Sequence, residues 1–132
     1  MPEALSADEV RRMRIVSIGM LLGVLMFLGV AALVHQMLKP PPVSILSWFA
    51  VGFALVSPLI AAAVDRARPD PATPGSPSAA FSRHLVAMAT LEAAGFLCAA
   101  ALLMSASFLP LGAALVPLGA MLLRFPRASA AS

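Results

Sequence analysis

The stretch that decides the fold runs from His84 to Met104 and has the sequence HLVAMATLEAAGFLCAAALLM. It is apolar and long enough for a helix that crosses a bilayer, whose hydrocarbon layer is ~30 Å thick. Glu92 lies about 12 Å from the start of such a helix, near the middle of that layer. Because an ionised side chain at this depth is costly, we expect the carboxyl to be protonated, paired, or turned toward protein or a water-filled cavity. Glu92 is therefore the candidate site.

Composition indicates a membrane protein rather than a soluble domain. Hydrophobic residues make up 61% of the chain and charged residues only 11%, against about 25% charged residues in a typical soluble domain. The formal net charge is +3, but Lys and Arg form no cluster with interleaved aromatic residues, so no nucleic-acid partner is expected. Cys98 is the single cysteine, which excludes a disulfide within the chain. The partner that composition implies is the lipid bilayer.

Three further apolar runs occupy residues 15–38, 43–64 and 109–123, and the last of them is the shortest. Three prolines follow Lys39 and end the first run, because proline lacks the amide hydrogen that a helix needs. The sequence therefore predicts an all-α fold, an integral membrane bundle of four transmembrane helices arranged as two hairpins. The predicted segments are an N-terminal segment (1–13), a first hairpin (14–64), a Pro-rich linker (65–82), a second hairpin that carries Glu92 (83–124) and a tail (125–132).

The distribution of positive charge predicts the topology. Of the nine Lys and Arg residues, only Lys39 lies in either of the two turns within the hairpins. Positive charge accumulates in cytoplasmic segments, so both termini and the linker are predicted to be cytoplasmic. The expected location is a bacterial-type inner (plasma) membrane, which the chain crosses several times.

Two local features predict details of the helices. Ser6 and Glu9 have the spacing of a capping box, in which each residue satisfies a free amide at a helix start, so the first helix should begin near Ala7. Pro58 lies inside the second apolar run, where it should kink the helix and free a carbonyl. A serine, a water molecule or a neighbouring helix must then satisfy that carbonyl.

Small residues on two of the helices indicate where another helix packs. Gly19 and Gly23 form a small-xxx-small pair, which lets a second helix approach closely, although glycine is also simply common in membrane helices. On the third run, residues at helical spacing share the face of Glu92, namely Met88, Ala89, Gly95, Phe96 and Ala99. The residues expected to pack against helices are thus Gly19, Gly23, Ala89, Gly95, Phe96 and Ala99.

The two predicted hairpins show a weak internal repeat. A shift of 69 residues places Gly23 over Glu92 and Phe27 over Phe96. Each half is then a helical hairpin that begins with an arginine at the cytoplasmic surface. Such a repeat would supply one carboxylate for each pair of hairpins.

The segment 92–99, EAAGFLCA, resembles the carboxylate-bearing helix of the c-type proteolipid subunits of rotary ATPases, in which a glutamate at mid-membrane precedes small and aliphatic residues. The linker residues 68–70, RPD, are similar to the short loop that joins the two helices of that family. The resemblance implies a ring of copies in which Glu92 binds a proton or a sodium ion. A second resemblance, in length and in the single membrane glutamate, is to the small four-helix multidrug exporters, and it implies a proton-coupled transporter.

Motifs of enzyme chemistry are not found. The sequence has no paired carboxylates, no His and Cys residues at metal-ligand spacing, no Gly-rich phosphate loop and no serine with an apparent base. His35 has no second ligand three or four residues away. No catalytic residue, metal site, cofactor or small-molecule substrate is therefore expected.

Two functions remain open from the sequence. The first is a proteolipid-like subunit that assembles into a homo-oligomeric ring or larger membrane complex, with Glu92 as a proton- or ion-binding carboxylate. The second is a structural or accessory subunit of a larger complex that transports no ion. In that case a protonated Glu92 hydrogen-bonds across helices, to Ser17, Ser57 or Thr90 of its own or another chain.

Overall fold

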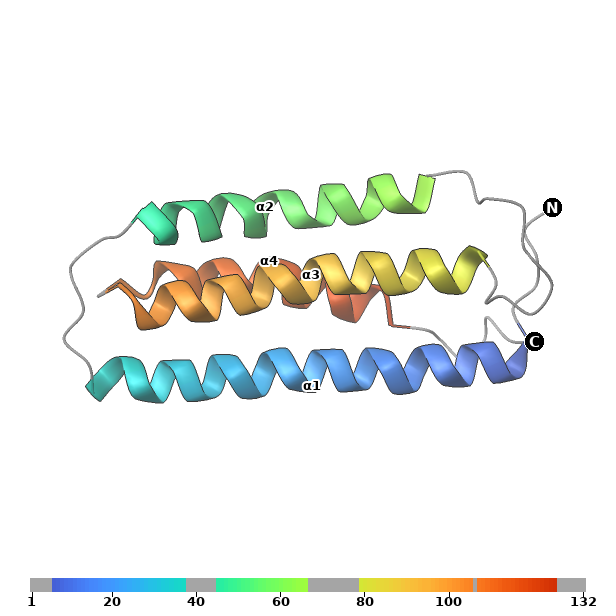
Figure 1. The fold of residues 1–132 in the computed structure, drawn as a ribbon, viewed down its shortest axis with the longest axis horizontal. Helices are drawn as coiled ribbons and strands as arrows, with labels where there is room; N and C mark the ends of the chain where they lie inside the picture. Colours follow the sequence, from blue (N-terminus) through green and yellow to red (C-terminus); the bar gives the residue numbers. More distant parts are fainter. Residues whose placement is uncertain (1–5, 38–44, 67–78, 106, 126–132) are drawn as a thin grey trace.

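The computed structural model describes residues 6–37, 45–66, 79–105 and 107–125, which form four α-helices and contain no strand. These are α1 (Ala7–Met37), α2 (Ile45–Arg66), α3 (Ala79–Leu103) and α4 (Leu109–Leu123). Successive helices run in opposite directions, so the start of α1 and the end of α4 lie at the same end of the molecule (Figure 1). The prediction of an all-α bundle of four helices is confirmed.

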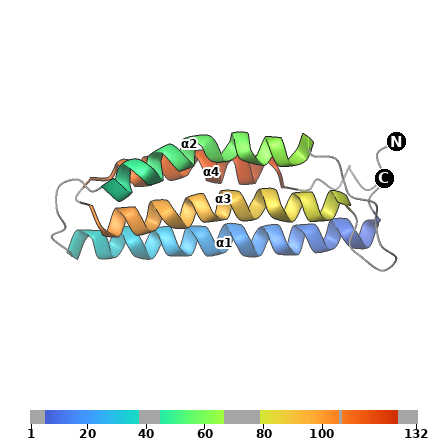
Figure 2. The same ribbon diagram turned by 45° about the horizontal axis from the view of Figure 1, so that its top comes forward.

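Helix α3 is the centre of the bundle, because it packs against each of the other three helices. It lies between α1 and α2, which do not touch each other within their described residues, as Figures 1 and 2 show. Helix α4 packs mainly against α3 and α2. Helix α1 therefore depends on α3 for most of its contacts, and these two helices run parallel.

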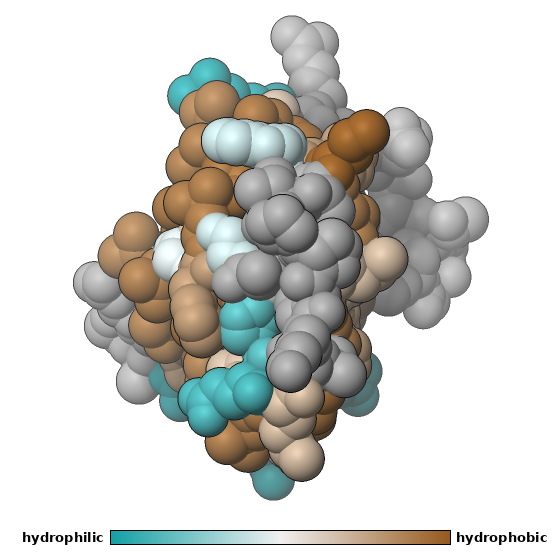
Figure 3. Space-filling view, turned by 90° about the vertical axis from the view of Figure 1, so that its left-hand side faces the viewer, coloured by the Kyte–Doolittle hydropathy of each residue, from teal (hydrophilic) through white to brown (hydrophobic). Residues whose placement is uncertain are grey.

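The outer surface of the bundle is that of a membrane protein. Helices α1, α2 and the 81–103 part of α3 are long and apolar enough to cross a bilayer. Helix α4 has 15 residues, or about 22 Å, and is shorter than the ~30 Å hydrocarbon layer. Large hydrophobic side chains such as Met26, Leu59 and Leu115 are exposed, and hydrophobic residues cover most of the described surface in Figure 3. These side chains require a lipid environment.

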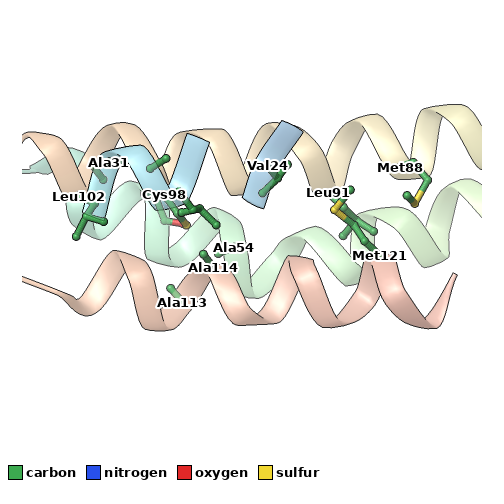
Figure 4. Close-up of a cluster of buried hydrophobic side chains, with 14 of the residues drawn as sticks. Val24, Ala31, Ala54, Met88, Leu91, Cys98, Leu102, Ala113, Ala114 and Met121 are labelled. Carbon is green, nitrogen blue, oxygen red and sulfur yellow. The ribbon is translucent and has the colours of Figure 1, made fainter. Parts of the chain in front are cut away.

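Close packing in the core comes from small residues on α2. Its buried positions recur every three or four residues and hold only serine and alanine: Ser47, Ala50, Ala54, Ser57 and Ala61. This narrow stripe lets α2 approach α3, whose Cys98 thiol lies 3.8 Å from the carbonyl oxygen of Ala50. Larger buried side chains from α1, α3 and α4, among them Val24, Met88 and Met121, fill the rest of the core (Figure 4).

The prediction for Pro58 is confirmed in one respect. Pro58 has no amide hydrogen and therefore leaves the carbonyl of Ala54 without its helical partner. The Ser57 hydroxyl donates a hydrogen bond of 2.8 Å to that same carbonyl oxygen. Ser57 and Ala54 are both fully buried, so the serine satisfies a polar group that no lipid or water could reach.

Replacing Ser57 with alanine is therefore expected to lower the free energy of unfolding by about 1 to 2 kcal/mol, because the Ala54 carbonyl would lose its partner. The measurement is reversible unfolding with sodium dodecyl sulfate in mixed micelles, followed by circular dichroism. Ser82→Ala is the control, since Ser82 is exposed on α3. Equal stabilities for the two variants would contradict this role of Ser57.

The start of α1 is also as predicted. The Ser6 amide donates to Glu9 Oε2 at 3.1 Å, and the Glu9 amide donates to Ser6 Oγ at 3.2 Å, which is a capping box. Around the Pro-rich linker the helices are longer than expected, because α2 continues to Arg66 and α3 already begins at Ala79. The remainder of the linker, 67–78, lies outside the described residues.

Candidate functional site

Glu92 lies on the side of α3 that faces α1, directly opposite Gly23. A Cβ atom built on Gly23 would be 4.0 Å from Glu92 Oε1 and 3.9 Å from Phe96 Cζ. Because glycine has no side chain, α1 leaves room at this level for both the carboxyl and the Phe96 ring. We call these residues, Gly23, Glu92 and Phe96, the carboxyl notch.

The Glu92 carboxyl has no hydrogen bond or ion pair within the described part of the chain. Its side chain is half-buried, at the edge of the contact between α1 and α3 rather than inside the bundle. Of the partners suggested by the sequence, Ser17 is bonded to His84 and Ser57 to a carbonyl of α2, and both are fully buried. The fold of one chain therefore leaves this carboxyl open on its outer side.

Toward the Leu103 end of α3, apolar contacts close the space between α1 and α3. The rings of Phe27 and Phe96 meet edge to face, with centroids 5.4 Å apart. Directly before Phe96, Gly95 packs against the side chain of Val24, which is fully buried. These contacts hold α1 and α3 at a fixed separation beside the notch.

Toward the Ala79 end of α3, a buried polar pair joins α1 and α3. Ser17 Oγ lies 2.8 Å from His84 Nε2, and both side chains are buried. This is the distance of a nucleophile and its general base, but Ser17 is 0% exposed, so no substrate reaches its hydroxyl in this conformation. Nearby, Arg124 forms an ion pair with Asp65, and the Arg83 guanidinium donates to the Asp65 carbonyl oxygen.

His84 opens the third apolar run of the sequence and is buried against α1. Sequence reasoning missed its pairing with Ser17 because the two residues are far apart in the chain and carry no local motif. The one available signal was the internal repeat, since the shift that pairs Gly23 with Glu92 also brings Ser17 close to His84. That shift matches the observed parallel packing of α1 and α3.

His35 forms a second polar contact between α1 and α3. Its Nδ1 lies 2.6 Å from the carbonyl oxygen of Leu102, and its ring meets Phe108 edge to face at 4.4 Å. A carbonyl oxygen only accepts, so Nδ1 carries the hydrogen and donates it. Leu102 lies in the last turn of α3, where carbonyls have no partner within the helix, so His35 caps α3 from the side.

The predicted packing residues fall into two groups. Gly23, Gly95, Phe96 and Ala99 lie in the contact between α3 and the rest of the bundle, and Met88 is buried with them. Gly19 has no atom within 4 Å of a Cβ built on it, and Ala89 is exposed, so neither packs within this chain. Within the described ranges no group of three His, Cys, Asp or Glu side chains could hold a metal ion.

Comparison with known protein families, curated proteins and solved structures finds no match for this chain. The resemblance to c-type proteolipid subunits therefore stays a prediction from the sequence, and its loop residues 68–70 lie outside the described residues. The geometry defines a small helical membrane protein in which the half-buried carboxyl of Glu92 lies at the centre of the candidate span 81–103.

Proposed function

We propose that this chain is a small, non-enzymatic membrane subunit that assembles with further chains, and that Glu92 is a proton- or ion-binding carboxylate at the assembly surface. The observation that carries the proposal is the carboxyl notch, in which Glu92 is half-buried beside Gly23 with no partner in the described part of its own chain. An acidic group at half depth in a bilayer needs protein or water around it. A neighbouring chain that covers the notch supplies that environment.

The surroundings of the notch favour reversible protonation over a fixed ion pair. The basic side chains of the chain lie near the ends of the helices, so none lies at the depth of Glu92 among the described residues. Without a cation beside it, the carboxyl is stable at rest only in its protonated form. A protonated carboxyl next to a neighbouring chain can give up and regain its proton, as the resemblance to the proteolipid subunits implies.

A second candidate function follows from the same observation. In a structural or accessory subunit the protonated Glu92 only hydrogen-bonds to a neighbouring helix and transports nothing. Such a bond contributes about 0.6 to 2 kcal/mol, enough to fix packing. A proton-coupled transporter like the small multidrug exporters is a third candidate. One pocket of about 520 Å³ lies between described residues of α1 and α4, but apolar residues and glycine line it and Glu92 is not among them.

The experiment is labelling with a hydrophobic, carboxyl-selective carbodiimide in intact membranes. We expect slow labelling of Glu92 that decreases at high pH, because the reagent needs the protonated acid. Glu92→Gln should abolish the labelling. Glu9→Gln should leave it unchanged, because Glu9 lies in the capping box at the start of α1.

The outcomes separate the candidates. Absence of Glu92 labelling in intact membranes would exclude a proton- or ion-binding carboxyl. If labelling occurs but Glu92→Gln leaves both assembly and proton or sodium flux in reconstituted vesicles unchanged, the structural role is correct. Loss of flux with intact assembly would establish the ion-binding role.

A further inference from the structure

The outer face of α3 differs from the other lipid-facing surfaces of the described bundle. Helices α1, α2 and α4 expose many large hydrophobic side chains, whereas among the described side chains of α3 only Val86 is a clearly exposed one. The other outward positions in the middle of α3 are Ala89 and Ala93. We call Val86, Ala89 and Ala93 the α3 face. Its small residues, spaced as small-xxx-small, allow close approach of another helix but offer little contact to lipid.

Two polar side chains, Glu92 and Thr90, border this face at nearly the same depth. At about 100° per residue, Ala89, Ala93 and Val86 fall between Glu92 and Thr90 around the helix, and the two polar residues are about 160° apart. Along the helix axis they differ by only about 3 Å. Residues two apart do not face each other on a helix, so the Thr90 of one chain cannot reach its own Glu92.

We propose that a second copy of this chain packs on the α3 face in the same orientation, so that Thr90 of each copy accepts a hydrogen bond from Glu92 of the other. This inference rests on the proposed function, in which a neighbouring chain covers the notch. A two-fold axis along the membrane normal, in front of the α3 face, places the Thr90 edge of one copy against the Glu92 edge of the other. Rotation about that axis changes no depth, so the two side chains meet within about 3 Å of each other along the membrane normal.

The hydrogen-bonding capacity of the two groups is complementary. The Thr90 hydroxyl donates to the carbonyl oxygen of Val86 at 2.9 Å, so its hydrogen is used and its remaining lone pair can accept. A protonated Glu92 has a hydrogen to donate and no acceptor in the described part of its own chain. Ser17 and Ser57 are fully buried in each copy, so Thr90 is the candidate of the three that a neighbour can reach.

This interface also covers a carboxyl that the single chain leaves half-buried. Glu92 is half-buried and Gly23 has no side chain that could cover it from α1, so the second copy completes the surroundings of the carboxyl. The two-fold arrangement sets α3 against α3 and makes the contact self-complementary and closed. The assembly is then a dimer with two equivalent Glu92 sites, in contrast to the ring that the proteolipid resemblance implies.

The test is disulfide cross-linking in native membranes from a Cys98→Ala background. Ala93→Cys should give a cross-linked dimer on mild oxidation, because the two copies of residue 93 lie close to the axis. Met26→Cys is the matched control, since Met26 is exposed on α1 at a similar depth and away from the α3 face. A monomeric Ala93→Cys variant, or equally efficient cross-linking of Met26→Cys, would overturn the proposed interface.

A second set of variants tests the hydrogen bond itself. Added to Ala93→Cys, Thr90→Val or Glu92→Leu should slow cross-linking about tenfold, whereas Glu92→Gln retains a donor and should cross-link at the original rate at every pH. In a mixture, a Thr90→Val copy and a Glu92→Leu copy keep one Glu92–Thr90 bond between them. Mixed dimers should therefore form faster than either variant alone, and equal rates would overturn the assigned contact.

The failure of this inference is distinguishable from failure of the proposed function. Carbodiimide labelling of Glu92 without cross-linking at residue 93 would leave the site intact and exclude a two-fold dimer at α3. Cross-linking without labelling would establish the dimer and exclude a proton- or ion-binding carboxyl.

Discussion

Replacing Gly95 with alanine is expected to lower the free energy of unfolding by about 2 kcal/mol, although alanine is the better helix former. A Cβ atom at this position would lie 2.6 Å from Val24 Cγ1, well inside van der Waals contact. Val24 cannot turn away, because a β-branched side chain in a helix has one strongly preferred rotamer and Val24 is 0% exposed. The helices α1 and α3 must therefore move apart.

The measurement is unfolding in mixed micelles, with Gly19→Ala as the matched control. A Cβ atom at Gly19 would meet nothing within 4 Å, so that substitution should be neutral or slightly stabilising. The double variant Val24→Ala with Gly95→Ala should recover most of the stability, since alanine at position 24 removes both Cγ atoms. Additive losses in the double variant would show that the two residues do not limit the approach of α1 to α3.

Much of the fold could be predicted because its determinants are local. The apolar runs predict the four helices, and the fourth run, 109–123, coincides with α4. The pair Ser6 and Glu9 predicts the first turn of α1, and Pro58 predicts a free carbonyl that Ser57 satisfies. The capping box and the Pro58 carbonyl each depend on residues within four positions of one another, and each apolar run is one continuous stretch of the sequence.

The surroundings of Glu92 could be predicted only in part. Its depth follows from counting residues along a helix, but hydropathy does not indicate which face of an apolar helix meets its own bundle. Of the residues expected on the Glu92 face, Gly95 and Ala99 pack inside the chain, whereas Ala89 is exposed. Long-range pairs such as His84 with Ser17 depend on the parallel packing of α1 and α3, which no local motif indicates.

The contact between α1 and α3 combines two different kinds of interaction. Polar bonds lie near its ends, at His84 and at His35, and apolar contacts lie between them. Polar bonds are directional, so they fix the register of two helices whose apolar surfaces alone would allow sliding. Glu92 thus meets Gly23 because the register is fixed on both sides of the notch.

Replacing His35 with alanine is accordingly expected to lower the free energy of unfolding by about 3 kcal/mol. The substitution removes the Nδ1 donor and leaves the Leu102 carbonyl without the partner that caps α3. It also creates a cavity, because His35 is only 6% exposed and its ring packs against Phe108. The loss should be measured by unfolding in mixed micelles against Gln36→Ala, whose side chain is exposed and which should be neutral.

Two further substitutions separate the hydrogen bond from the packing. His35→Phe keeps an aromatic ring against Phe108 but lacks the donor, so it should retain only part of the stability. His35→Gln keeps an amide donor that can reach the Leu102 carbonyl oxygen and loses the ring. If His35→Phe were as stable as the unmodified chain, the bond to Leu102 would contribute nothing, and the register of α1 against α3 would rest on the apolar contacts and His84 alone.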